Sequence, residues 1–476
     1  MPNTALPIAV IGAGPVGLAA AAHLLERGEE PLVFESGPKV GHAVRQWSHV
    51  RMFSPWSFNI DKAAERLLDA HGWQRPDPDE LPTGGDIVAR YLEPLAEIPA
   101  MRSRIKLNTR IVAVSRKAMD KVRTKGRADQ PFVLRAVNGD GSERVVEAKA
   151  VIDASGTWFS PNPAGSDGLP AIGEAAAAGR IAYGIPDVLG PERARYAGKR
   201  TLVIGGGHSA LNALLELAEL KETESKTTIV WALRKTRVED AYGGEAADQL
   251  SARGALGAAA RHLVESGAVE VITPFRAQRI DTGCCGIKVV GDRDGEEQRI
   301  SADQIIVATG FRPDLAMLRE LRLTVDPWLE SSGTIGPLID PNLHSCGSVR
   351  PHGAAELAHA EPNFFIAGMK SYGRAPTFLL ATGHEQVRSI AAALTGDTES
   401  AARVELCLPE TGVCVTRPRG ATKVEEACCD PKPEQAAAGG CCGPEKSEVA
   451  AVTSTGCCGP AKAAPAIAAR SGSCCD

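Results

Sequence analysis

The stretch PIAVIGAGPVGLAAAAHLLERGEEPLVFE, residues Pro7–Glu35, decides the fold of this chain. Its first apolar run, Ile8–Ile11, suits a buried parallel strand, and the pattern G-x-G-x-x-G follows at once with Gly12, Gly14 and Gly17. The Ala/Leu-rich segment after the glycines favours a helix, and a second apolar run precedes the terminal acid. The order predicts a βαβ unit that binds a dinucleotide.

Each glycine has a physical role in such a unit. Gly12 makes the tight turn, Gly14 lets the backbone approach a pyrophosphate, and Gly17 allows the helix to pack closely on the strand. Pro15 lies in the same turn, and the pyrophosphate is expected at the positive end of the helix. Glu35 ends the second strand and would accept hydrogen bonds from a ribose, which suits FAD or NAD and repels a 2′-phosphate.

A second unit begins at Lys199 with KRTLVIGGGHSALNALLELAEL. Gly205, Gly207 and Ala210 form G-x-G-x-x-A on another predicted strand-to-helix turn, where Ser209 either caps the helix or contacts a pyrophosphate. The next predicted strand, from residue 227 to 233, ends in two cations instead of an acid. These cations, Arg234 and Lys235, match a 2′-phosphate, so this unit is interpreted as an NADPH site.

Composition narrows the class of protein. The chain has 476 residues, enough for two or three domains, and its net charge of −5 with no long basic patch argues against nucleic acid as a partner. No apolar run reaches the length of a membrane span, and the first residues lack the basic start of a signal peptide. We therefore expect a cytoplasmic protein without a membrane partner.

The aromatic loop after Glu35 allows two interpretations. Trp47, Phe53, Trp56 and Phe58 stand close together in a chain that is only 4% aromatic. They either complete the core or form a wall over a flavin ring, and Trp47 is our candidate for the cofactor contact.

Further motifs extend the pattern. The chain continues to DQIIVATGFRPD at 303–314, and to PNFFIAGMKSYGRAPTFLLATGHEQVRSIAAAL at 362–394. In this order the motifs resemble the two-dinucleotide flavoproteins, which include flavin-containing monooxygenases and disulfide reductases. The resemblance implies an α/β fold with two Rossmann-like domains, bound FAD and NADPH, and additional cofactor contacts at Thr309, Gly310, Gly368, Met369 and Gly383.

The same resemblance implies the domain organisation. The FAD domain would comprise residues 1–165 and 306–400, with an NADPH domain inserted at 195–305. The composition of the last part of the chain, and not the resemblance, predicts a Cys-rich, largely disordered tail at 401–476. The oligomeric state is left open, with a homodimer as one alternative.

Cysteine positions separate the two branches of these flavoproteins. Disulfide reductases need a redox-active cysteine pair beside the flavin, but before residue 400 the chain has only Cys284, Cys285 and Cys346. The first two are adjacent, so their Cα atoms lie about 3.8 Å apart, less than the roughly 4.4–6.8 Å usual for a disulfide. The pattern favours a monooxygenase, in which NADPH supplies the electrons, O2 the oxygen atom, and the flavin the chemistry; we assign no protein residue as catalytic.

The tail supplies a hint about the substrate. Ten of the 13 cysteines lie after residue 400, and eight of these form four adjacent pairs. Adjacent thiolates suit a soft ion that tolerates irregular geometry, such as trivalent arsenic, antimony, mercury or Cu(I). The candidate metal ligands are Cys428, Cys429, Cys441, Cys442, Cys457, Cys458, Cys474 and Cys475.

Together, body and tail resemble the flavin-dependent monooxygenases carried in arsenic-resistance gene clusters. The resemblance implies that a small molecule, a trivalent arsenical or a similar soft nucleophile, is oxidised to the pentavalent form. Two alternatives stay open: a soft-metal or disulfide-type reductase that uses FAD and NADPH, and a flavoenzyme of unrelated substrate whose tail only buffers metal.

Overall fold

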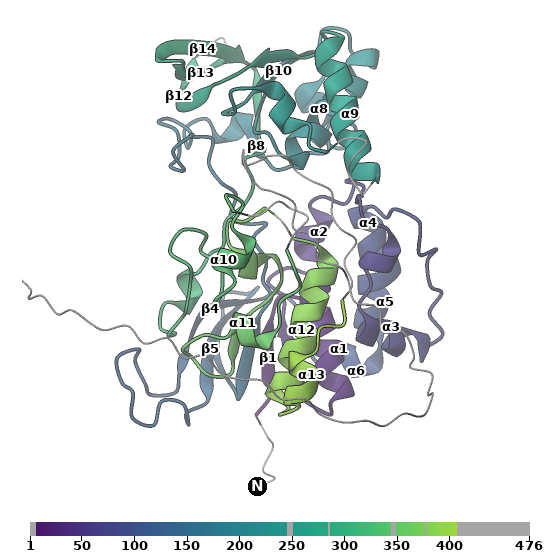
Figure 1. Ribbon diagram of the computed structural model, residues 1–476, viewed down its shortest axis with the longest axis vertical. Helices are drawn as coiled ribbons and strands as arrows, with labels where there is room; N and C mark the ends of the chain where they lie inside the picture. Colours follow the sequence, from purple (N-terminus) through teal and green to yellow (C-terminus); the bar gives the residue numbers. More distant parts are fainter. Residues whose placement is uncertain (1–5, 245–250, 284–285, 344–348, 377, 407–476) are drawn as a thin grey trace, which may run out of the picture. The chain divides into compact units, whose positions relative to one another are not determined.

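The computed structural model describes residues 6–244, 251–283, 286–343, 349–376 and 378–406. Its architecture is mixed α/β, with two parallel sheets and two small antiparallel sheets (Figure 1). No helix within these ranges is both long and apolar enough to cross a membrane.

The first sheet has five parallel strands in the order β16-β7-β1-β2-β3. Its strands are β1 (Ile8–Ile11), β2 (Pro31–Phe34), β3 (Ile105–Lys106), β7 (Ala150–Asp153) and β16 (Phe364–Ile366). β1, β7 and β16 are fully buried, as expected when helices and a second sheet cover both faces. Because β16 pairs with β7, this sheet combines segments from the beginning and the end of the described chain.

Helices from both ends of the chain cover the first sheet. α1 (Pro15–Glu26) and α12 (Leu380–Leu394) lie side by side (Figure 1). The other helices of the N-terminal part are α2 (His42–Arg45), α3 (Lys62–Asp69), α4 (Gly84–Ile87), α5 (Glu93–Glu97) and α6 (Pro99–Arg102). The remaining helices after residue 310 are α10 (Gly336–Ile339), α11 (Ala354–Leu357) and α13 (Thr398–Ala402).

A three-stranded antiparallel sheet packs against the first sheet. It consists of β4 (Thr109–Arg116), β5 (Phe132–Asn138) and β6 (Glu143–Ala148). The alternating sequence from Phe132 to Ala148 predicts this meander, and its buried Phe132 and Leu134 join a core that includes Ile11 of β1. The expected single strand over Arg104–Val114 is instead divided, because Asn108 has a φ of +49° and turns the chain from β3 into β4.

The second parallel sheet has the order β11-β10-β9-β15-β8. Its strands are β8 (Ile181–Tyr183), β9 (Arg200–Ile204), β10 (Thr228–Ala232), β11 (Glu270–Ile272) and β15 (Gln304–Val307). Its helices are α7 (Arg193–Tyr196), α8 (His208–Thr223) and α9 (Ser251–Glu265). The antiparallel strands β12 (Arg276–Gly283), β13 (Gly286–Arg293) and β14 (Glu296–Ala302) share a core with this sheet.

One predicted helix differs in detail. Helical spacing predicts a helix over Asp86–Leu95, and the chain does coil there, but Val88–Leu92 forms a π-helical turn between α4 and α5. The side chains of Val88 and Leu92 remain buried, so the apolar spacing that predicts the helix is satisfied although its pitch changes.

Candidate functional site

The first glycine-rich turn is built so that two of its glycines cannot be replaced without a backbone shift. Gly12 has a φ of +103°, and a Cβ there would lie 2.7 Å from the carbonyl oxygen of Ala154. A Cβ on Gly17 would lie 1.9 Å from the carbonyl oxygen of Gly12. A Cβ on Gly14, in contrast, would meet no described atom within 4 Å. The turn is therefore closed toward the sheet and open where a pyrophosphate would approach.

Glu35 is fixed beside this turn. One carboxylate oxygen accepts the Ala13 N–H at 3.0 Å, the other accepts the Gly37 N–H at 2.9 Å, and the residue is 7% exposed. Helix α1 starts after Gly14 with Pro15 in its first turn, and no side chain in the described part of the chain caps it. Its backbone N–H groups and the adjacent acid are the donor and acceptor set that a dinucleotide requires, so the residues present fit that ligand.

A buried ion pair lies at the carboxyl end of β7, and no sequence motif predicts it. The Lys370 ammonium lies 2.7 Å from the Asp153 carboxylate and 3.1 Å from Ser155 Oγ, and the lysine and aspartate side chains are 2% and 0% exposed. Asp153 also accepts the Ser155 N–H. The one available signal was the acid that ends the strand in VIDASG, two residues before a glycine-containing turn.

Packing and backbone conformation explain the glycines at positions 368 and 383. Gly368 has a φ of +73°, and its N–H donates to the Gln386 side chain at 2.8 Å. Gly383 allows close packing of α12 on α1, because a Cβ there would lie 2.6 Å from a methyl carbon of Val16. Met369 follows Gly368 and is half-buried. Gly368, Met369 and Gly383 thus lie near the start of α1, while their cofactor contacts remain predictions.

The second glycine-rich turn repeats the first. Gly205 has a φ of +135°, with the Ala308 carbonyl oxygen 2.3 Å from where a Cβ would be. A Cβ on Gly207 would again meet no described atom within 4 Å, and Ala210 is fully buried. The capping alternative for Ser209 is wrong: α8 begins at His208 with Gly207 as its N-cap, which puts Ser209 inside the helix, and no described side chain caps this end.

The two cations after β10 lie at the surface. Arg234 donates to the Ser166 carbonyl oxygen at 3.0 Å, and Lys235 donates to the Asp240 carbonyl oxygen. Both side chains are exposed. They remain accessible to a phosphate, and their role in NADPH binding remains a prediction.

The A-T-G turn after β15 is tied to a preceding loop. Thr309 Oγ1 donates to the Asn162 carbonyl oxygen at 3.0 Å, and the Asn162 amide donates back to the Thr309 carbonyl oxygen at 3.0 Å. Gly310 has a φ of +87°. The two hydrogen bonds between Thr309 and Asn162 hold this turn next to Gly205, which faces the carbonyl oxygen of Ala308.

The two tryptophans of the aromatic loop, Trp47 and Trp56, differ in burial. Trp56 is fully buried, which supports the core interpretation for that side chain. Trp47 is half-buried, packs over Gly84 and lies 6.4 Å from the Trp158 ring. The structure therefore places Trp56 in the core, and Trp47 packs against the same core, while its cofactor contact remains a prediction.

The cysteines fall outside the described residues. All eight candidate metal ligands lie in the segment after residue 406, and Cys284, Cys285 and Cys346 are likewise in undescribed stretches. Within the described residues, no group of three or more His, Cys, Asp or Glu side chains could hold a metal ion.

Comparisons with known proteins agree with this architecture. A family model described as pyridine nucleotide-disulphide oxidoreductase matches residues 9–332. A ferredoxin–NADP reductase of Gluconobacter oxydans is 28% identical over 244 residues, which are 49% of this chain and 63% of that protein, so the match spans less than two thirds of that relative.

Solved structures show the same fold at low identity. A bacillithiol disulfide reductase from Bacillus cereus aligns with a TM-score of 0.61 and 20% identity, over 83% of this chain and 99% of that one. An FAD-bound cadaverine monooxygenase from Erwinia amylovora aligns with a TM-score of 0.56 and 14% identity, over 88% and 100%. At these identities the likeness concerns the fold alone.

Proposed function

Since this chain belongs to the pyridine nucleotide-disulphide oxidoreductase family and is an oxidoreductase that uses FAD and NAD(P)H, we propose that it is an NADPH-dependent monooxygenase of a soft nucleophile. The proposed substrate is a trivalent arsenical, oxidised in the cytoplasm to the pentavalent form. One oxygen atom of O2 forms a bond to arsenic, whose oxidation state rises by two. The other atom leaves as water, and NADPH supplies the two electrons.

The observation that carries the proposal is the position of the cysteines. The described residues, which include both glycine-rich turns and the segments around them, contain no cysteine. A disulfide reductase needs a cysteine pair next to its flavin, whereas an oxygenase passes electrons to a diffusible acceptor. The Cys doublets after residue 406 support a thiophilic substrate, because paired thiolates bind soft trivalent ions well.

The chain's own residues would bind and orient the two cofactors. Glu35 would accept hydrogen bonds from the FAD ribose, and the open side of the turn at Gly14 would receive the pyrophosphate. Arg234 and Lys235 would pair with the 2′-phosphate of NADPH. Bound FAD supplies the redox chemistry, since it accepts a hydride and returns electrons to an acceptor.

The Asp153–Lys370 pair would fix the backbone between the two cofactor contacts. It joins the end of β7 to the segment after Gly368, with both charges buried and matched. A buried pair of this kind holds its elements in one arrangement, because separating the charges would leave one of them uncompensated.

A reductase is the second candidate, and one observation favours it. The relative with 28% identity is a ferredoxin–NADP reductase, a type of enzyme that passes electrons onward without inserting oxygen. In that case the acceptor would be a soft metal ion or a redox protein.

Oxygen dependence decides between the two candidates. NADPH consumption by the FAD-loaded full-length protein should rise on addition of arsenite or a methylated trivalent arsenical, with pentavalent product in equal amount, and should cease without O2. Continued substrate-dependent turnover under anaerobic conditions would establish the reductase. We further propose that the Cys doublets of the tail bind the trivalent arsenical and deliver it to the flavin. A variant ending at Gly420 tests this role, and unchanged turnover at low substrate would contradict it.

A further inference from the structure

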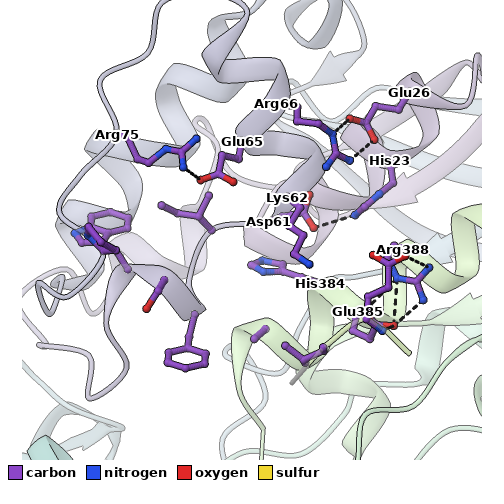
Figure 2. A pocket seen from close by; sticks show the side chains of 18 of the residues that line it. His23, Glu26, Asp61, Lys62, Glu65, Arg66, Arg75, His384, Glu385 and Arg388 are labelled. Carbon is purple, nitrogen blue, oxygen red and sulfur yellow. Dashed lines mark hydrogen bonds and ion pairs between the residues drawn. The ribbon is translucent and has the colours of Figure 1, made fainter. Parts of the chain in front are cut away.

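A cavity of about 750 Å³ lies apart from both glycine-rich turns. It is lined by α1, α3, α12, the loop before α3, the prolines near residue 77 and the chain after α13 (Figure 2). None of the residues predicted to bind FAD or NADPH lines it. Its volume is in the range of pockets that hold small molecules.

One face of α1 and one face of α12 form one side of the cavity. On each helix the lining residues are spaced three and four apart, so they share one face. From α12 they are Ala381, His384, Glu385 and Arg388, and from α1 they are His23, Glu26 and Arg27.

Most charges around the cavity are already paired. Glu26 accepts two hydrogen bonds from Arg66, at 2.7 and 2.8 Å. Arg75 and Glu65 are 2.9 Å apart, and Arg388 approaches Glu385 to 2.6 Å, as the dashed lines in Figure 2 show. Because each of these carboxylates has a guanidinium partner, the cavity offers little attraction to a second cation.

Lys62 is the exception among the cations. It is the first residue of α3, it lines the cavity, and its ammonium forms no ion pair or hydrogen bond with any residue that the structure describes. The Lys62 side chain is exposed, so its ammonium is hydrated, and a ligand anion at this position would take the place of that water.

His384 provides an unsatisfied polar atom in the same cavity. The residue is 6% exposed, and its Nε2 has no hydrogen-bond partner among the described residues. Burial lowers the pKa of His384, and the charge of His23 adds to that effect while Asp61 opposes it. A buried imidazole nitrogen without a partner is costly, and a ligand carboxylate that accepts a hydrogen bond from it removes the cost.

The oxygens of the neighbouring carboxylate already have partners within the protein. Asp61 accepts the N–H groups of Ala63 and Ala64 with one oxygen and lies 2.9 Å from His23 Nε2 with the other. Burial by itself would raise the pKa of Asp61, but the His23 and His384 side chains outweigh it and hold that pKa below its usual value. The carboxylate is thus ionised and fully occupied by its own partners.

The rest of the wall is apolar. Trp56 is fully buried, and Phe58, Ile60, Pro76 and Ala381 line the cavity with it. We propose that this cavity is a binding site for a small organic carboxylate, with the carboxylate group between Lys62 and His384 and the apolar body against Phe58 and Ile60. The site goes beyond the proposed redox function and does not depend on it.

Benzoate is a suitable probe, with benzamide as its neutral isostere and acetate as the anion without an apolar body. Calorimetric titration of FAD-loaded full-length protein should give a benzoate Kd of about 1 mM, as expected for so small a ligand. Benzamide and acetate should bind at least about tenfold more weakly, because each lacks one of the two recognised features.

Variants assign the binding to this cavity. Lys62→Gln should weaken benzoate binding by about five- to tenfold, and Lys62→Arg should retain it. Lys226→Gln is the matched control, since Lys226 is an exposed lysine before β10 and does not line the cavity. His384→Phe should abolish binding, with the flavin content confirming that the protein has folded.

Three results would overturn the proposal: no benzoate binding up to 20 mM (roughly twentyfold above the expected Kd), equal binding of benzamide, or equal effects of Lys62→Gln and Lys226→Gln. None of these measurements uses NADPH turnover, so failure here and failure of the proposed monooxygenase are distinguished.

Discussion

The two glycine-rich turns have similar backbone conformations, but the strands that follow them end in side chains of opposite charge. In both, the first glycine has a positive φ and faces the carbonyl oxygen of an alanine that directly follows a neighbouring strand, Ala154 after β7 for Gly12 and Ala308 after β15 for Gly205. In both, the helix that follows lacks a side-chain cap from any described residue, which leaves its N–H groups for phosphate. The strand ends then differ: a buried acid follows β2, and two exposed cations follow β10.

This difference shows two ways to select a ribose. Glu35 is held by two backbone N–H groups and has little freedom, so it recognises a hydroxyl pair by geometry. Arg234 and Lys235 are at the surface and, among the described residues, hydrogen-bond only to carbonyl oxygens, so they would recognise a phosphate mainly by charge. Selection by the second turn should accordingly be weaker and more sensitive to salt.

The largest effect is expected at the last small residue of each glycine-rich pattern, which is Gly17 in the first turn and Ala210 in the second. Gly17→Ala places a Cβ against the Gly12 carbonyl oxygen, so we expect a loss of roughly 3 kcal/mol and FAD binding about 100-fold weaker. Ala210→Gly makes the opposite change in the second turn and should cost only about 1 kcal/mol. Flavin absorbance per protein and thermal unfolding measure both. Equal FAD loss in the two variants would contradict the close-packing account of Gly17.

A smaller effect is expected at the second strand end. The double variant Arg234→Ala/Lys235→Ala should raise the KM for NADPH about tenfold, corresponding to about 1.4 kcal/mol, because the charge facing the 2′-phosphate is removed. The KM for NADH should not change, and this cofactor is the internal control. Steady-state kinetics at two salt concentrations test the account: a parallel rise for NADH would mean that these residues do not select the phosphate.

The smallest effect concerns the helices that follow the turns. α8 carries a partly buried acid, Glu216, whose pKa is raised to about 7 by burial, whereas α1 has alanines at its centre. A carboxyl group with a raised pKa in the folded state stabilises the protein at low pH, and this contribution is lost as pH rises toward 7. The stability of the Glu216→Gln variant relative to the unmodified protein should therefore increase between pH 5 and 8, by about 1–2 kcal/mol of unfolding free energy.

Melting temperatures across this pH range measure the gain. Glu219→Gln, on the exposed side of the same helix, is the control and should show no comparable gain. A constant difference between Glu216→Gln and the unmodified protein at all pH values would argue against titration of Glu216.

The sequence predicts local features of this protein well, because they depend on neighbouring residues. The strands and helices around Gly12 and Gly205 follow from apolar runs and glycine spacing, and the meander follows from alternation. The likeness to flavoproteins of known fold confirms the α/β architecture with parallel sheets.

Features that join distant parts of the chain were not predicted. Asp153 and Lys370 are 217 positions apart, and neither local sequence indicates that the two side chains form a pair. The cavity combines His23, Asp61 and His384, each unremarkable in its own segment. The prediction that Ser209 caps α8 is wrong for a local reason. Gly207 provides the extended backbone of the N-cap, and α8 starts one residue before the serine.

The discontinuous first sheet also determines the order in which a growing chain can fold. All strands of the second sheet lie between residues 181 and 307, so a ribosome releases them together. β7 pairs with β1 early, but its other edge stays open until Phe364–Ile366 has been synthesised. An open edge strand is a template for pairing between chains. Nascent or truncated chains that end before β16 should therefore aggregate through β7, whereas the complete sheet ends at β16, a short edge strand of three residues.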